Sequence, residues 1–165
     1  MTQKAIIRHL HPDDIDRLVE IALAAWAPVY ESFKNILGEE LFALQYPDCL
    51  DNKKEQILRV CQTDSPGTVL VAEQKGIIVG FVSFYPNAPK HNMAEIGNNA
   101  VHPDFQRQGI AQAMYQEVLR CLREQGIHFA KVFTGGDPSH LPARRAYEKA
   151  GFDIALPSVE YFRHL

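Results

Sequence analysis

Cysteine is scarce in this sequence. The three cysteines among 165 residues, Cys49, Cys61 and Cys121, are odd in number and lie far apart. Such a set does not form a disulfide framework and is typical of reduced thiols in a cytoplasm. Long apolar runs are missing too, because no stretch approaches the roughly 20 apolar residues that a membrane-spanning helix needs, and the first residues lack the pattern of a secretory signal. We therefore expect a cytoplasmic protein without a membrane partner.

A strong excess of one charge is also absent. The sequence has 17 Lys and Arg against 20 Asp and Glu, a net charge of −3. Residues 101–150 carry seven basic and five acidic side chains, a local charge of +2, and the remainder carries −5. This basic share is too small for a nucleic-acid-binding surface, but it can help to hold a small polyanion. The seven histidines form no H-x-x-x-H motif and no Cys/His cluster, so we expect no metal site.

The length suits one domain with a real core, so we treat residues 1–165 as a single domain. In chain order, the pattern predicts a strand at 4–10, a helix from Pro12 that Pro28 ends or kinks, helical regions at about 31–45 (split near Gly38) and 51–62, a hairpin at 67–86, a strand at 93–101 with a bulge at Gly97, a helix between Gly109 and Gly126, a strand at 128–134, a helix at about 139–150, and closing strands at 152–156 and 159–165. This order predicts a mixed α/β domain with one central sheet.

The stretch VHPDFQRQGIAQAMYQEVLRCL, residues 101–122, passes from a strand through a polar turn directly into a helix. A helix start leaves about four N–H groups without partners and carries a partial positive charge. Gly109 has no Cβ, so the backbone can approach a ligand, and Ala111 keeps the next turn open. Together with Arg107 at the rim, these residues indicate a nest for phosphate oxygens, although one glycine before a helix is also common in sites without a ligand. The dinucleotide and mononucleotide glycine motifs are both absent.

Two motifs in this part of the chain resemble the GCN5-related N-acetyltransferase (GNAT) superfamily. Gln106-x-x-Gly109-x-Ala111 matches its [RQ]-x-x-G-x-[GA] signature, after a strand ending in A-V-x-P. Its closing A-x-x-x-Y-E-K-x-G-F pattern is matched by Ala143, Tyr147, Glu148, Lys149, Gly151 and Phe152. The resemblance implies a central, mostly antiparallel sheet that is splayed between its fourth and fifth strands and flanked by helices. It also implies N-acetyltransferase activity.

The resemblance further implies acetyl-coenzyme A as the co-substrate. Its pyrophosphate would lie on the amides of Arg107 to Gln112, and its pantetheine arm would pair with the strand that ends at Val101. The implied cofactor contacts are Asn99, Ala100, Val101, Gln106, Arg107, Gln108, Gly109, Ile110, Ala111, Gln112, His140 and Ala143. At His140 this sequence departs from the family, which often has Asn there.

The implied reaction is attack of an amine on a thioester. A Lys-like amine is protonated at pH 7, and removing its proton costs roughly 4.6 kcal/mol, so a base or a water relay is needed. By resemblance Glu95 is the candidate base, but it is an ordinary surface residue if the strand register differs by one. A water oriented by Asn98 or Asn99 is the alternative. By resemblance Tyr147 protonates the departing thiolate, although its helical face also suits a core aromatic residue.

Three aromatic residues recur at helical or near-helical spacing: Trp26, Tyr30 and Phe33. They either form a wall of the pocket that binds the acceptor amine or pack in the core against the sheet. Residues 1–65 hold eleven acidic and seven basic side chains, a bias that favours a cationic amine. We therefore expect acetyl transfer to a primary amine of a small molecule or peptide in a ternary complex. A coenzyme A-binding sensor or partner-binding module without turnover is the alternative, and a nucleotide-binding protein is a third reading. The resemblance also suggests a homodimer formed through the last strands.

Overall fold

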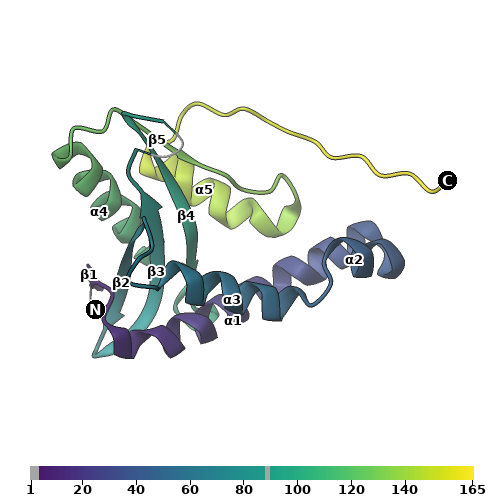
Figure 1. Ribbon diagram of the computed structural model, residues 1–165, viewed down its shortest axis with the longest axis horizontal. Coiled ribbons are helices and arrows are strands. Elements are labelled where there is room, and N and C mark those ends of the chain that lie inside the picture. Colours follow the sequence, from purple (N-terminus) through teal and green to yellow (C-terminus); the bar gives the residue numbers. More distant parts are fainter. Residues whose placement is uncertain (1–3, 88–89) are drawn as a thin grey trace.

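The computed structural model describes residues 4–87 and 90–165 (Figure 1). Its elements are β1 (Ile6–His9), the 3-10 turn η1 (Pro12–Asp14), α1 (Ile15–Leu37), α2 (Glu39–Gln45), α3 (Cys49–Val60), β2 (Thr68–Gln74), β3 (Ile77–Tyr85), β4 (Met93–Val101), η2 (Pro103–Phe105), α4 (Ile110–Glu124), β5 (Phe129–Val132), η3 (Pro138–His140) and α5 (Leu141–Ala150). The predicted mixed α/β class is confirmed.

In the described part of the chain, five strands form one sheet in the order β1-β2-β3-β4-β5. The first four strands are antiparallel neighbours, whereas β5 runs parallel to β4. Pairing between these last two strands ends at Ile96 and Val132, although β4 continues to Val101. The two strands therefore separate at this end, and β4 offers an unpaired edge there. The predicted splayed sheet is confirmed.

Strand β4 contains the bulge that was predicted at Gly97. Val82 pairs with Asn99 and Phe84 with Ile96, so two residues of β4 lie opposite Ser83 alone. A Cβ at Gly97 would approach the Ser83 hydroxyl to 2.8 Å, which explains the glycine. The bulge shifts the alternation of side chains, and so it sets which way each residue at the end of β4 points.

Two hydrophobic cores cover the two faces of the sheet. One packs Met114 and Val118 of α4 and Tyr147 of α5 against the sheet. The other packs Leu18 of α1 and Ile57 of α3 against the opposite face. In Figure 1, α2 lies at the far end of α1, away from the sheet. None of the helices in the described part of the chain combines the length and apolarity that crossing a bilayer requires.

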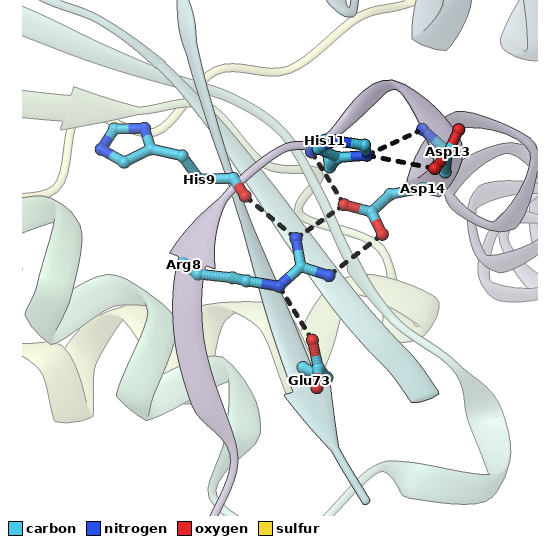
Figure 2. A network of polar contacts seen from close by, with 6 residues as sticks. All are labelled: Arg8, His9, His11, Asp13, Asp14 and Glu73. Carbon is cyan, nitrogen blue, oxygen red and sulfur yellow. Dashed lines mark hydrogen bonds and ion pairs between the residues drawn. The ribbon is translucent and has the colours of Figure 1, made fainter. Parts of the chain in front are cut away.

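A polar network fastens the start of α1 to the sheet (Figure 2). Arg8 of β1 donates from Nε to Glu73 of β2 at 2.8 Å, and its two terminal nitrogens donate to the Asp14 carboxylate at 2.7 and 3.0 Å. The same carboxylate accepts from the His11 backbone amide at 2.8 Å. Asp14 is buried, and the hydrogen bonds from Arg8 hold the pKa of its carboxyl below the ordinary value.

The prediction that Pro28 ends the first helix is wrong, and the alternative, that Pro28 kinks the helix, stays a prediction. Helix α1 continues through Pro28 to Leu37 and ends where Gly38 adopts a φ of 79°. Proline inside a helix removes one hydrogen bond and destabilises the helix by about 3 kcal/mol. Packing of α1 on α3 and the sheet outweighs that local preference. The break that was predicted near Gly38 is confirmed, because α2 begins at Glu39.

The two predicted closing strands, 152–156 and 159–165, are wrong. After Phe152 the chain forms no regular element and leads away from the body (Figure 1). A strand needs a neighbour for its backbone hydrogen bonds, and this segment has none in the described single chain. Its apolar side chains remain uncovered, with Ile154 90% and Leu156 96% exposed.

Candidate functional site

The turn before α4 presents backbone amides at the surface. Residues 106–109 are exposed, whereas Ile110 is buried and anchors the helix start in the core. The Ala113 amide bonds to the Gly109 carbonyl at 3.0 Å, and so the amides of the three residues before Ala113 precede the helical ladder. Gly109 and Arg107 both adopt positive φ values, of 80° and 60°. This arrangement can bind an anion.

The surroundings of this helix start leave room for a ligand. A Cβ at Gly109 would meet nothing within 4 Å. Gln112 donates from Nε2 to the Lys149 carbonyl at 3.1 Å, but its buried Oε1 has no hydrogen-bond partner among the described residues. Gln106 donates to the Val101 carbonyl at 3.1 Å and ties the turn to β4. Open space, exposed amides and a nearby Arg107 fit a diphosphate group.

Asn99, at the end of β4, joins two tyrosines. Its Oδ1 accepts from the Tyr115 hydroxyl at 2.7 Å, and its Nδ2 donates to the Tyr147 hydroxyl at 3.1 Å. The two aromatic rings lie 5.0 Å apart, at 40° to one another. The predicted cofactor contact Asn99 therefore uses its side chain within the protein. The backbone of residues 99–101 lies on the strand edge that β5 leaves unpaired.

Tyr147 extends from α5 and is 6% exposed. Burial raises the pKa of its phenol, and hydrogen bonds with Asn99 and Tyr115 oppose that shift only in part. The hydroxyl therefore keeps its proton at neutral pH and remains a donor. It lies in the core and at the end of β4 at once, so both sequence interpretations of Tyr147 describe the same position.

Glu95 lies on β4 two residues before the bulge. Its neighbours Ala94 and Ile96 point into the core under α4 and α5, so Glu95 points to the opposite face, on the side of α1 and α3. Its carboxylate forms an ion pair with Lys131 of β5, with 3.2 Å between Oε2 and Nζ, and its side chain is 37% exposed. The carboxylate therefore faces the side of α1 and α3 and already has a partner.

Trp26, Tyr30 and Phe33 line a cavity of about 550 Å³ that is bounded by α1, α2 and α3. Phe33 stacks on Tyr46 with ring centroids 5.2 Å apart, and Tyr30 lies 5.7 Å from Trp26. The other lining residues are Gln45, Tyr46, Pro47, Cys49, Asn52, Lys53, Glu55, Gln56 and Arg59. The structure thus brings the three predicted acceptor residues together at one cavity.

His140 is the last residue of η3 and precedes α5. Its Nδ1 lies 2.5 Å from Oδ1 of Asp137, and its ring stacks on Phe33 with centroids 5.8 Å apart and meets Trp26 edge-on at 6.0 Å. Ala143 follows one turn later and is partly buried against the core under α4 and α5. His140 therefore stands between the aromatic cavity and the start of α5.

The acetyltransferase (GNAT) family model matches residues 29–152. The chain belongs to the GNAT family. The match runs from within α1 to just after α5, and so it includes Tyr30 and Phe33 but not Trp26, together with the end of β4, the start of α4 and Tyr147. The resemblance that the two short motifs indicated is confirmed.

Similar GNAT proteins include mycothiol acetyltransferases. The protein from Propionibacterium freudenreichii subsp. shermanii is 23% identical over 93% of this chain and 44% of its own length. The one from Saccharomonospora viridis is 30% identical over 59% of this chain and 33% of its own length. An uncharacterized N-acetyltransferase of Methanocaldococcus jannaschii is 26% identical over 89% of this chain. The chain spans less than half the length of these mycothiol acetyltransferases.

Solved structures show the same GNAT fold. The paia N-acetyltransferase from Thermoplasma acidophilum, in complex with coenzyme A, superposes with a TM-score of 0.68 at 21% identity, over 93% of this chain and 92% of that chain. AAC(6')-Iy, in complex with the bisubstrate analog CoA-S-monomethyl-acetylneamine, gives 0.59 at 15% identity, over 99% and 100%. At these identities the likeness establishes the fold.

Sequence reasoning on this GNAT chain missed Lys53. The residue is 4% exposed, its Nζ lies 3.6 Å from the Trp26 ring centroid, and it donates to Gln56 at 2.8 Å and to Asn98 at 3.3 Å. Burial lowers its pKa to about 8. Its position in α3, four residues before the buried Ile57, was a helical-face signal that could have located it.

Tyr115 was missed as well. It follows Met114 on the buried side of α4, where a tyrosine hydroxyl needs a partner, and that requirement could have directed attention to it.

Proposed function

We propose that this protein transfers the acetyl group of acetyl-coenzyme A to a primary amine by direct attack in a ternary complex. One observation carries the proposal: a buried, proton-bearing Tyr147 hydroxyl lies at the end of β4, where β5 has separated from it. Helix α4 packs on one face of the sheet, and helices α1 and α3, which line the aromatic cavity, pack on the other. A thioester carrier and an amine would therefore meet beside a proton donor.

The donor side is assigned to the start of α4 and the end of β4. The amides of residues 107–112 would hold the diphosphate, with Arg107 at the rim and Gln106 fixing the turn. The unpaired edge at Asn99, Ala100 and Val101 would bind the pantetheine arm, with Ala143 and His140 across from it. The coenzyme A in the Thermoplasma acidophilum neighbour supports this choice of co-substrate. When bound, acetyl-coenzyme A supplies an activated acyl group.

The chain's own residues then manage charge and protons. A backbone N–H of the bulged strand, near Asn99 or Ala100, would stabilise the oxygen on which negative charge develops. Tyr147 would donate its proton to the sulfur as the carbon–sulfur bond breaks. Glu95 is the base that the family resemblance favours, and it faces the acceptor side of the sheet.

The acceptor side is assigned to the cavity lined by Trp26, Tyr30 and Phe33. Its charged lining residues are Lys53, Arg59 and Glu55, a charge of +1. The cationic amine that the composition of residues 1–65 favoured gains no support from this lining. A small molecule or peptide amine fits the size of the cavity, and the names of the mycothiol acetyltransferases and of AAC(6')-Iy support a small-molecule acceptor.

The test measures acetyl transfer from acetyl-coenzyme A to each amine of a panel. The measured signal is the release of the free coenzyme A thiol. We expect the wild type to acetylate at least one amine and Tyr147→Phe to lower kcat by about 100-fold, the range typical of a lost general acid. A sensor or partner-binding module would instead bind acetyl-coenzyme A tightly and show no transfer. Its Tyr147→Phe variant would behave like the wild type.

We also propose that residues 1–165 act as one domain and that residues 153–165 pair with a second copy. Both cores draw on elements far apart in the chain, which supports a single unit. The uncovered side chains of Ile154, Leu156 and Tyr161 support the homodimer. Deleting residues 153–165 should convert a dimer to a monomer in sedimentation. A full-length chain that sediments as a monomer would contradict the dimer.

A further inference from the structure

An acetyl transfer needs a base on the acceptor side as well as an acid on the donor side. The amine that enters the cavity is protonated at neutral pH and cannot attack until it loses a proton. The base must reach the amine and must hold an unused lone pair. Glu95 and His140 are the two residues to compare.

We propose that His140 is the general base for the acceptor amine and that Asp137 is its positioning residue. The proposal rests on the proposed function, because it assigns a step within that reaction. It departs from the family resemblance, which gave the base role to Glu95 and a cofactor contact to His140.

The contact between His140 and Asp137 fixes which ring nitrogen is free. A carboxylate only accepts hydrogen bonds, and so the 2.5 Å contact places a proton on Nδ1; in the neutral ring the lone pair is then on Nε2. Nε2 has no hydrogen-bond partner among the described residues. The side chains of His140 and Asp137 are 13% and 12% exposed, so neither pairs freely with water. This is the arrangement that a neutral imidazole base requires.

Asp137 is itself held in place. Its Oδ2 accepts from the Ser139 amide at 3.0 Å, from the Ser139 hydroxyl, and from the Ser32 hydroxyl of α1 at 3.2 Å. Burial raises the pKa of the Asp137 carboxyl, but the hydrogen bonds from Ser139 and His140 outweigh burial and lower it to about 2. Arg144 donates to the carbonyls of Gly135 and Asp137 at 2.6 and 2.9 Å and holds the loop. The carboxylate is therefore ionised and oriented before any amine arrives.

The ring of His140 lies next to the acceptor cavity. It contacts Phe33 and Trp26, which line that cavity. Tyr147 follows seven residues later, in α5 and about 10 Å along the helix axis. Between them in the chain lies Ala143, which has a small side chain. A base at one end of this interval and an acid at the other match the two protons that the transfer moves.

Glu95 lacks the features that His140 has. Its carboxylate is paired with Lys131 at 3.2 Å and more than a third of its side chain is exposed. The charged and titratable groups around His140 include Asp137 beside it, Arg144 of α5, Tyr30 of α1, Tyr46 on the other side of Phe33, and Lys53 beyond the Trp26 ring.

The step balances as follows. Nε2 of His140 takes one proton from the ammonium group, and the neutral nitrogen forms its bond to the acetyl carbon as the carbon–sulfur bond breaks. Tyr147 protonates the sulfur and recovers a proton from the newly acylated nitrogen. His140 then releases its proton to water. The products are the amide, free coenzyme A thiol and one proton.

The experiment compares two classes of acceptor in the full chain. One is the best alkyl amine from the panel, which is protonated at pH 7. The other is an amine of similar shape that is unprotonated at pH 7, such as the corresponding O-alkylhydroxylamine. His140→Gln should lower kcat/KM for the alkyl amine by about 100-fold or more, the range expected for a lost general base, and lower it for the neutral amine by less than fivefold.

Two further readouts separate a base from a structural or cofactor-binding residue. The loss in His140→Gln should shrink as pH rises and the alkyl amine loses its proton unaided, while the dissociation constant for acetyl-coenzyme A stays within twofold. Asp137→Asn should lower kcat/KM by about tenfold and change the pH profile in the same sense. His128→Gln, at an exposed histidine, is the matched control and should match the wild type.

His140→Ala extends the test if the glutamine variant melts at a lower temperature than the wild type. Added imidazole should restore its transfer to the alkyl amine. Equal losses with both amine classes, weaker acetyl-coenzyme A binding at unchanged kcat, or a loss confined to Glu95→Gln would each overturn the role of His140 while acetyl transfer itself stands. A wild type that binds acetyl-coenzyme A and acetylates nothing would overturn both proposals.

Discussion

The side-chain amide of Asn99 donates to the hydroxyl of Tyr147 across 3.1 Å and so joins the end of β4 to α5. The same amide group accepts from Tyr115 at 2.7 Å, so one side chain positions two phenols. We expect Asn99→Ala to leave both buried hydroxyls without this partner, which destabilises the fold by about 1–3 kcal/mol.

Activity should fall more than stability explains, because Tyr147 loses its orientation. We expect kcat of Asn99→Ala to drop about tenfold, measured by thiol release under conditions where the variant is fully folded. Tyr115→Phe is the matched control, because it keeps the contact between Asn99 and Tyr147. An equal drop in that control would show that the tyrosine pair, and not Asn99, sets the rate.

Gly109→Ala tests the nest at the start of α4. An L-residue with a side chain is strained at a φ of 80°, so we expect a loss of about 1–2 kcal/mol in the free energy of unfolding. Gly126→Ala, at the other end of α4 with a φ of 73°, should lose a similar amount. Affinity for coenzyme A, measured by calorimetry, should fall about tenfold in Gly109→Ala alone. Equal affinities in the two variants would place the diphosphate elsewhere.

Because of Lys53, the free energy of unfolding should change with pH in the alkaline range. Burial lowers its pKa in the folded protein to about 8 from an ordinary value of 10.5. Between these values the unfolded chain binds more protons, and so the free energy of unfolding rises as pH increases from about 8 to 10.5. The gain is at most about 3 kcal/mol, and solvent screening reduces it.

Lys53→Met should remove this rise, measured by urea denaturation at several pH values. Lys54→Met, at the exposed neighbouring position, should keep it. A wild type whose stability is flat over this range would show that the buried ammonium is better compensated than its contacts with Trp26, Gln56 and Asn98 suggest.

Asp14 makes the fold sensitive to acid. Its carboxyl has a pKa below the ordinary 3.8, chiefly through hydrogen bonds from Arg8. The contribution is therefore complete above that value and is lost as pH falls below it. We expect Asp14→Asn to lower the free energy of unfolding at pH 7 by about 1.5–3 kcal/mol, and the difference from wild type to vanish in acid. Asp13→Asn, at a side chain that is 90% exposed, should have little effect at either pH.

Local patterns were sufficient to predict the glycine-opened start of α4 and the bulge in β4. Gly109 and the polar turn before it are short-range signals, and the glycine at 97 marks a bulge because a Cβ there would collide with Ser83. The alternation in β4 also fixes which face Glu95 occupies. These features depend on neighbours in the chain, and so a single sequence contains them.

The remaining features depend on contacts between distant segments. Pro28 lies within a helix because tertiary packing outweighs a local preference, and residues 152–165 contain apolar residues without the neighbour that a strand needs. The contact of His140 with Asp137 is local, but the position of its ring against Phe33 depends on how α1 crosses the start of α5. The hydrophobic periodicity of a sequence does not predict how two distant helices cross.

The residues proposed for the two substrates come from different parts of the chain. Those proposed for the acyl carrier lie from Asn99 onward, beside the edge where β4 and β5 separate, while the aromatic cavity is lined by residues between 26 and 59. Mutations that reshape the aromatic cavity can therefore accumulate without changing the residues proposed to bind the acyl carrier at the start of α4 and the end of β4. In this architecture the specificity for the acceptor amine can therefore change through substitutions in the first third of the chain alone.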